Sequence, residues 1–434
     1  MHRFSTRIIL LITLLAAVFG YAQDAPTSVK IDTIEVVGNE RTRDSVILRE
    51  LHFNPPCEVD QQDLEIIQNR LSNLFIFNRV QVGVFEMDDK NILQIQVTET
   101  WYLYPVPILF LNDREWDRIS YGFKLTHYNF RGMNEKLNVG GWLGFNPSFF
   151  LSYNNPWVGT KSRFIMRGTV FGKRTQNRFS DVTGEGFQDR QLGGSVTLGK
   201  RLTLNTSLRA SFGMRRIEFP DDKISFSTSG TKVDFFPSAS LTLSTDHRDL
   251  REYPRSGYSA RYSLIRGGFT ENQADFWRWE MDNRVYIPLH KRFSLAARNL
   301  LKLNRGQQPT YSYTFLGYGE RIRGYFDRRL PAQNLMLQNL EMRISLLPVR
   351  YFSWKDAPLM SQLFQDMKFG ISMGLHMDSG TVWERSRDIA IDNFLTGYGV
   401  GLHLHLPHIY LLRIDHTWSD QGRGEWLIEG GVSF

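Results

Sequence analysis

The sequence predicts a mainly β protein, a sixteen-stranded antiparallel transmembrane β-barrel preceded by one small α+β domain. Three observations support this fold class. The 434 residues are rich in aromatic side chains and glycine, with 31 Phe, 17 Tyr, 10 Trp and 35 Gly. The mean hydropathy of −0.33 is nevertheless that of a water-soluble protein, which does not fit a helical membrane protein. From residue 101 onward, apolar and polar residues alternate in segments of about ten residues, as in barrel strands whose outer face meets lipid.

The first 22 residues have the features of a secretory signal peptide. Arg3 and Arg7 supply positive charge, residues 8–19 are apolar but too short to span a membrane, and residues 20–22 fit a cleavage site. An uncleaved anchor is the alternative. Cleavage after Ala22 lowers the formal net charge from +7 to +5. This small excess on a secreted chain does not favour a nucleic-acid partner.

Residues 28–100 have the pattern of a small α+β domain. The expected elements are, in order, a strand over 31–37, a helix beginning near Thr42, a helix beginning at Asp60, and strands over 77–86 and 91–99. Leu64, Ile67 and Leu71 recur at helical spacing in the second helix. A domain of this size has a modest core and is able to fold alone.

Residues 101–434 form the predicted barrel domain. Strands are expected near 102–110, 117–129, 134–145, 147–156, 162–173, 188–200, 203–217, 231–244, 256–267, 275–288, 292–304, 335–346, 366–378, 396–406, 409–418 and 425–434. A period of two places alternate residues on opposite faces. A soluble β-sandwich also alternates, but its strands are usually shorter, and here the polar face is rich in glycine and charge, as a wet lumen would be.

The final strand illustrates the alternation. It is expected to place Trp426, Ile428, Val432 and Phe434 outward, against Glu429 and Ser433. The stretch between about 305 and 334 is unusually long for a barrel loop, which indicates a function. Its centre carries alternating charges, and two acids expected to face inward, Glu341 and Asp378, lie on the next two strands. An arginine between two carboxylates makes bidentate hydrogen bonds that would hold the loop to the wall.

The segment Ile322, Arg323, Gly324 and Tyr325 resembles the signature of the inward-folded loop in the outer-membrane assembly superfamily (BamA/TamA-like proteins). Its barrel domain is also called bacterial surface antigen. Other segments that carry the resemblance are Asp246, Arg248 and Asp249 with Pro254 and Gly257, then 340–343 and 378–383, and a POTRA-like stretch over 31–100. The resemblance covers nearly the whole mature chain and implies sixteen strands, in agreement with the count made from periodicity.

The resemblance implies an outer-membrane protein of a Gram-negative-type bacterium, with its POTRA domain in the periplasm. It implies insertion of β-barrel proteins into the membrane or translocation of polypeptide across it, with a dedicated two-partner-type secretion pore as the alternative. The implied partners are unfolded outer-membrane or secreted polypeptides, outer-membrane lipids and accessory periplasmic proteins. Insertases of the family commonly carry several POTRA domains. This chain has room for only one POTRA domain, which does not favour a docking platform for several accessory lipoproteins.

Carried over to this chain, Arg323 would pair with Glu341 and Asp378 inside the barrel. A barrel closes by pairing its first and last strands, and a weak pairing leaves backbone groups that are able to template an incoming strand. Gly430 and Gly431 lie in the expected last strand, where glycine weakens pairing, so a lateral gate is expected there. Phe434 resembles the C-terminal aromatic assembly signal of outer-membrane proteins, and a membrane-face anchor is its structural alternative.

No enzyme signature stands out, so a non-enzymatic protein without a cofactor or metal is expected. Residues 193–197 lack the final glycine of a G-x-S-x-G elbow, and the sequence contains no Walker A loop and no H-E-x-x-H motif. His403, His405 and His408 are interpreted as lumen-lining residues, since no acid neighbours them in sequence. A barrel hydrolase and a passive porin are the remaining alternatives. A porin would need neither the POTRA-like domain nor the charged loop.

Overall fold

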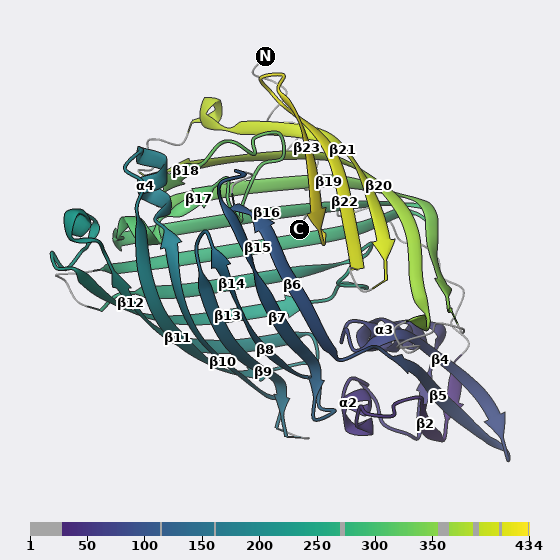
Figure 1. The fold of residues 1–434 in the computed structure, drawn as a ribbon. Helices are drawn as coiled ribbons and strands as arrows, with labels where there is room; N and C mark the ends of the chain where they lie inside the picture. The colour runs from purple at the N-terminus through teal and green to yellow at the C-terminus, as the bar shows by residue number, and fades with distance from the viewer. Residues whose placement is uncertain are drawn as a thin grey trace.

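The computed structural model describes residues 28–112, 115–159, 162–269, 274–354, 364–384, 390–407, 410–432 and 434. The expected signal peptide, 1–22, and His408 lie outside this part of the chain. A sixteen-stranded sheet forms the main body, with every described pairing between neighbouring strands antiparallel (Figure 1). The prediction of sixteen antiparallel strands is confirmed. Helices in the described residues include none that is both long and apolar enough to cross a membrane.

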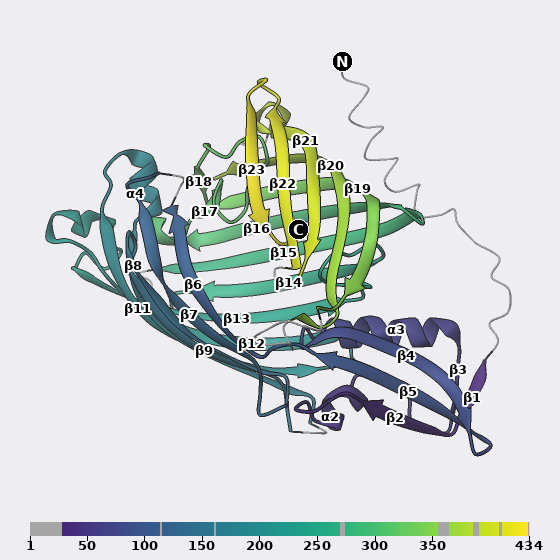
Figure 2. The same cartoon turned by 45° about the vertical axis from the view of Figure 1, so that its right-hand side comes forward.

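The strands follow the chain in order around the sheet. They are β6 (Leu103–Leu111), β7 (Ile119–Phe130), β8 (Glu135–Gly144), β9 (Ser148–Val158), β10 (Phe164–Gln176), β11 (Gln188–Arg201), β12 (Thr206–Glu218), β13 (Val233–Asp246), β14 (Gly257–Gly267), β15 (Asp275–His290), β16 (Phe293–Gln307), β19 (Asn334–Phe352), β20 (Met367–Trp383), β21 (Leu395–Leu406), β22 (Tyr410–Ser419) and β23 (Gly424–Gly430). Figure 2 shows the sheet curled round a common interior, with the first strands in blue and the last in yellow.

Short elements lie in the connections between these strands. They are α4 (Arg178–Thr183), η3 (Asp221–Phe226), η4 (Thr310–Ser312), η7 (Ile391–Asn393) and the two-stranded sheet of β17 (Thr314–Leu316) and β18 (Leu330–Ala332). The last of these belongs to the long connection between β16 and β19. The chain therefore places an ordered loop, with its own hydrogen-bonded pair of strands, at the stretch that the sequence marks as unusual.

The two faces of the sheet have different chemistry. On β20, Phe369, Leu375 and Met377 are exposed on the outer face, whereas His376 and Asp378 are buried inside. The same alternation recurs on β21, where Tyr398 and Leu402 are exposed and His403 and His405 are buried, because successive side chains of a strand point to opposite faces. The outer face is therefore an apolar wall, and the inner face carries the charges and glycines that the sequence assigned to a lumen.

The N-terminal domain has its own hydrophobic core. Its strands and helices are β1 (Val29–Ile31), β2 (Thr33–Val37), α2 (Asp44–Leu48), β3 (Cys57–Val59), α3 (Gln61–Ser72), β4 (Phe77–Met87) and β5 (Lys90–Glu99), with sheet order β2-β5-β4. Asp60 and Asp63 form a capping box that starts α3 at the predicted residue, and Ile67 and Leu71 are fully buried beneath it. The short strand β3, which pairs with β1, was not expected; three residues are too few to give a periodic signal.

The N-terminal domain packs against the turns at one end of the barrel. Arg70 on α3 donates to Asn205 in the turn between β11 and β12 at 2.7 Å. Asn73 donates to the carbonyl of Asp249 and accepts from the backbone N–H of Arg251, both at 2.7 Å. These three contacts fasten α3 to two turns of the barrel, and Figure 2 shows the domain lying under this end.

The end of the chain differs from the expectation. Phe434 does not face outward: it is 3% exposed, packs on Tyr286 and Ala296, and its carbonyl accepts from the Tyr286 hydroxyl at 3.2 Å. Strand β23 stops at Gly430, and Gly431 has a left-handed φ of +88°, which turns the chain away from the strand direction. Alternation holds only while the strand continues, so the membrane-face position predicted for Phe434 is wrong.

Candidate functional site

The long loop between β16 and β19 folds into the interior of the barrel. Ile322 and Tyr325 are buried in a cluster with Leu300, Leu335 and Leu337 of the adjoining strands. These three leucines point inward among otherwise polar neighbours, so they give the loop an apolar seat on the wall. This apolar contact places Arg323 against the inner face of β19 and β20.

Arg323 is held between two carboxylates. Its Nε and one terminal nitrogen donate to the two oxygens of Asp378 at 2.7 and 2.8 Å, and the other terminal nitrogen donates to Glu341 at 2.8 Å. The backbone N–H of Arg323 also donates to Asp378, at 3.1 Å. The arginine is 4% exposed and each acid 1%. The structure thus brings together the three residues that the resemblance paired, and the fork geometry fixes the loop tip in position as well as in charge.

A second arginine extends the network across the lumen. Arg343 donates to the free oxygen of Glu341 at 2.7 Å and to the carbonyl of Pro254 at 2.8 Å. Its guanidinium lies 4.6 Å from the ring centre of Tyr253 and 5.7 Å from that of Phe434. The buried charges of this cluster therefore alternate in sign and share hydrogen bonds, which offsets their desolvation.

Two glycines allow the loop to approach the wall. Gly324 has φ +95°, and a Cβ there would lie 2.7 Å from the carbonyl oxygen of Trp418. On β21, a Cβ at Gly397 would lie 1.8 Å from the carbonyl oxygen of Arg323. A side chain at either position would push the loop away from the wall and lengthen the hydrogen bonds of Arg323.

The loop also contacts the last strand, β23, through two acids. Glu425 of β23 accepts from the backbone N–H groups of Gly324 and Phe326 at 2.8 and 3.2 Å. Glu429 of the same strand pairs with Arg321 of the loop at 3.1 Å. Both acids occupy odd positions, opposite in phase to the exposed Trp426 and Ile428, so their inward direction was present in the alternation pattern. Their partner was not, because contact across a lumen leaves no local signal.

The earlier motif lies at the end of β13. Asp246 makes a bidentate pair with Arg248 at 2.8 Å and a further ion pair with Arg251 at 2.9 Å. Asp249 accepts from the backbone N–H of Arg255 at 3.0 Å. This motif therefore shapes the turn that contacts α3 of the N-terminal domain, and its contact with the Arg323 cluster is the Pro254 carbonyl that accepts from Arg343.

Two of the buried histidines, His403 and His405, lie within hydrogen-bond distance of neighbouring polar side chains. Nδ1 of His403 lies 2.9 Å from the hydroxyl of Tyr253, and His405 lies 3.0 Å from Ser372. No group of three histidine, cysteine or acidic side chains suited to a metal ion occurs in the part of the chain that the structure describes. The two histidines line the lumen side of β21.

The two ends of the sheet are β6 and β23, and no pairing between them occurs among the described residues. At the two ends of β6, the carbonyl of Tyr102 accepts from the N–H of Tyr128, and the N–H of Asn112 donates to the carbonyl of Arg118. The backbone groups of even-numbered residues of β6 therefore point to β7, and those of odd-numbered residues point to the free edge. Pro105 and Pro107 are both odd. Their nitrogens point to the free edge and cannot donate, so the centre of this edge offers carbonyls without matching N–H groups.

The free edge of β23 has a full set of backbone groups. The N–H of Gly431 donates to the carbonyl of Leu411 of β22. The backbone groups of odd-numbered residues of β23 therefore point to β22, and those of even-numbered residues point to the free edge of the sheet. Gly424, Trp426, Ile428 and Gly430 therefore each present a donor and an acceptor to the free edge. The two ends of the sheet are unequal: one is complete and the other lacks two donors.

Comparison with known proteins identifies the family of both regions. The Omp85 superfamily domain matches residues 129–434, and the surface antigen variable number repeat, a POTRA model, matches residues 29–100. BamA from Haemophilus ducreyi lacking POTRA domains 1–3 has a similar structure, with a TM-score of 0.54, 16% identity, and coverage of 93% of this chain and 83% of that one. CdiB from Escherichia coli matches with a TM-score of 0.50, 13% identity, and coverage of 95% and 91%. No match was found among curated proteins.

Proposed function

This chain belongs to the Omp85 superfamily, and we propose that it inserts β-barrel proteins into the outer membrane through a gate between β6 and β23. Barrels of this superfamily are outer-membrane proteins with periplasmic POTRA domains, and this chain shares that location. Superfamily members are assembly or transport proteins, so its role lies in the insertion of β-barrel proteins or the translocation of polypeptide. We infer that neither bond chemistry nor a cofactor is needed, because folding of the client supplies the free energy.

The proposal of a gate rests on the difference in backbone donors between the free edges of β6 and β23. Closure of the barrel would pair the edge of β23 with an edge of β6 that lacks N–H groups at Pro105 and Pro107. In lipid no water replaces the missing donor, so we expect this seam to be the weakest in the wall. An incoming strand gains more from β23, where Trp426 and Ile428 each offer a donor and an acceptor. We propose that clients first add to this edge.

The Arg323 cluster and its loop hold only one of the two strands of the proposed gate, β23. The loop tip is fixed to β19 and β20 by Arg323, and to β23 through Glu425 and Glu429. We propose that the loop keeps β23 in place while β6 moves away, so that the complete edge stays fixed as a template. Gly430 then provides a flexible end to the template, and Phe434, buried against Tyr286, keeps its predicted role as the signal for assembly of this chain itself.

The POTRA domain offers further unpaired edges. Strands β2 and β4 are the ends of its sheet, and β4 is eleven residues long. We propose that β4 captures unfolded clients by strand addition. A photo-crosslinking amino acid at the exposed Gln81 of the full chain should trap unfolded client peptides, whereas the same probe at Gln68 on α3 should not. Equal trapping at both positions would count against capture by the edge.

Translocation is the second candidate, and two adjoining cavities favour it. One of 450 Å³ lies between α3 and the barrel turns, and another of 370 Å³ lies inside the lumen; they share Arg201, Arg248 and Arg251. Depletion of the protein separates the candidates. A general loss of outer-membrane barrels supports insertion, loss of a single secreted protein supports a dedicated pore, and no change in either contradicts both.

A disulfide across the seam tests the gate itself. In a background where the single native cysteine is replaced, C57S, the pair P105C and G430C should crosslink under oxidation and abolish function, and a reductant should restore it. The pair P105S and G430S, which cannot crosslink, is the matched control. Full function of the crosslinked protein would overturn the gate.

A further inference from the structure

We propose that the lumen holds a binding site for an extended, acidic segment of unfolded polypeptide. The inference rests on the proposed role in handling polypeptide, and it adds the chemistry of the segment. Four cations carry it: Lys136, Arg167, Arg209 and Arg261, one on each of β8, β10, β12 and β14. We call them the basic row.

The strand register places these cations in one slanting row across the inner wall. Lys136 lies opposite Asn154 of β9, which lies opposite Arg167. Arg167 lies opposite Thr197 of β11, which lies opposite Ser211, two residues along β12 from Arg209. Arg209 donates to Ser244 of β13 at 2.9 Å, and Ser244 lies opposite Arg261. The residues between the cations have short polar side chains, so no large side chain stands between the charged groups. Each cation also lies within five residues of a turn at the end of the barrel where the POTRA domain packs.

The basic row has no acidic partner among the described residues. Lys136 lies over the ring of Tyr128, and Nε of Arg209 is buried without a hydrogen-bond acceptor. Arg167 and Arg261 are exposed to the lumen and form no ion pair within the described chain. Charges of one sign that line a concave wall raise the local concentration of the opposite charge, so the row attracts anions.

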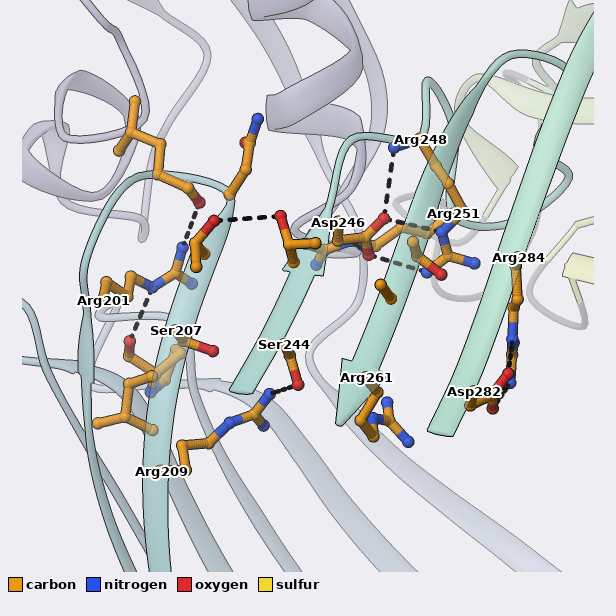
Figure 3. Close-up of a pocket in the computed structure, with 18 of the residues that line it drawn as sticks. Arg201, Ser207, Arg209, Ser244, Asp246, Arg248, Arg251, Arg261, Asp282 and Arg284 are labelled. Carbon is orange, nitrogen blue, oxygen red and sulfur yellow. Dashed lines mark hydrogen bonds and ion pairs between the residues drawn. The ribbon is translucent and has the colours of Figure 1, made fainter. Parts of the chain in front are cut away.

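The cavity beside the row has the same excess of positive charge. Six arginines and two aspartates line it, and Figure 3 shows their side chains converging on the space. Both aspartates are already neutralised: Asp246 by Arg248 and Arg251, and Asp282 by Arg284. The remaining lining arginines, Arg201, Arg209 and Arg261, make no ion pair in the described chain. Because the cavity adjoins the one beneath α3, a segment released from the POTRA domain reaches it directly.

The spacing of the row fits an unfolded chain. Neighbouring strands are about 4.8 Å apart, so Lys136 and Arg167 are about 10 Å apart, and the two-residue offsets at Arg209 and Arg261 raise the next two separations to about 12 Å. Unfolded polypeptide favours the polyproline II conformation, in which every third residue returns to the same side after about 9.3 Å. Carboxylates at every third position would therefore meet successive members of the row. The four cations span about 32 Å, or about ten residues of such a chain, which is much longer than a phosphate ion.

Peptide binding to the full-length protein in nanodiscs tests the site. The probe is a fluorescent twelve-residue peptide with Glu at every third position, and the control peptide carries Gln there. Fluorescence anisotropy at low salt should show the Glu peptide binding at least tenfold more tightly. Each exposed ion pair is expected to contribute a factor of about three, so R167Q/R209Q/R261Q should weaken binding about 30-fold.

A matched pair of variants separates the row from general charge. R261Q should weaken binding about threefold, whereas K200Q, which removes a cation on the outer face beside Phe164, should leave it unchanged. Heat-modifiable electrophoretic mobility verifies that each variant folds. Equal affinity for the Glu and Gln peptides overturns the site. Displacement of the peptide by inorganic phosphate, with equal affinity for a peptide carrying a single Glu, also overturns it in favour of a small-anion site.

The result is independent of the insertion assay. Depletion of the protein could change neither the outer-membrane barrels nor the secreted proteins while the protein still binds the peptide. That result would contradict the proposed function and support the site. A loss of barrels on depletion, together with no preference for the Glu peptide, would leave the function and remove the site.

Discussion

The β19–β23 side of the lumen buries its charges in closed ion-pair networks, whereas the β8–β14 side leaves its cations open. Arg323, Glu341 and Asp378 are almost completely buried, and each has a charged partner within 2.8 Å. Arg167 and Arg261 are exposed and have no such partner in the described chain. The difference follows from water. Where the loop fills the lumen, a charge survives only if it is compensated; where a cavity remains, solvent or a ligand compensates it.

The comparison also predicts what each side is for. A closed network resists change and holds the loop, β19, β20 and β23 as one unit. The open basic row is free to exchange water for an anionic segment. The two ends of the sheet, β6 and β23, lie where the two sides meet, so closure of the barrel would pair the strand held by the loop with one whose edge lacks two donors.

Removing the central arginine should have the largest effect. R323A leaves Glu341 and Asp378 buried without their cation, and breaking a buried ion pair in this way costs about 3–5 kcal/mol. We expect a large fall in the urea midpoint of the barrel and release of the loop to protease. R167A on the open side is the control and should change stability by less than about 0.5 kcal/mol. Equal effects of the two variants would break the comparison.

Restoring donors at the seam should have the next largest effect. P105V/P107V adds two N–H groups to the free edge of β6, and each new hydrogen bond is worth about 0.5–1.5 kcal/mol. We expect a barrel more stable by about 1–3 kcal/mol and slower in client insertion, measured by urea titration and by insertion into vesicles. I108V is the control, because the N–H of residue 108 faces β7. Faster insertion by the double variant would contradict the gate.

Weakening the contact between loop and last strand should have a smaller effect. In E425Q an amide oxygen replaces the carboxylate that accepts from Gly324 and Phe326, and a neutral hydrogen bond has about half the strength of a charged one. We expect a loss of about 1 kcal/mol, seen as faster trypsin cleavage within the loop. E384Q, at an exposed acid beyond β20, should leave cleavage unchanged. If E425Q is cleaved no faster than this control, the loop does not depend on β23.

Removing cations from the open side should have the smallest effect on stability. R209Q/R261Q relieves like-charge repulsion without breaking an ion pair, so the urea midpoint should correspond to a change within about 0.5 kcal/mol. The same variant should weaken binding of the acidic peptide. A destabilisation as large as that of R323A would mean that the basic row is structural after all.

Much of the architecture could be predicted because it depends on local patterns of apolar and polar residues. Alternation with period two located all sixteen strands, and helical spacing with the Asp60 cap located α3. The inward faces of Glu341 and Asp378 followed from the same alternation. The predictions failed where the pattern stops: β3 is too short to show one, and Phe434 lies beyond Gly431, after the strand has ended.

The sequence by itself determined the strand count and the inner and outer faces, because these depend on neighbours along one strand. The pairing of the loop arginine with two acids was implied by the resemblance of its motif to the superfamily. Tertiary structure alone decided that Glu425 and Glu429 hold the loop, that Pro105 and Pro107 turn their nitrogens to the free edge, and that four cations from separate strands form one row. Those features depend on register and on curvature of the sheet, which bring together residues from different strands and leave no trace in local periodicity.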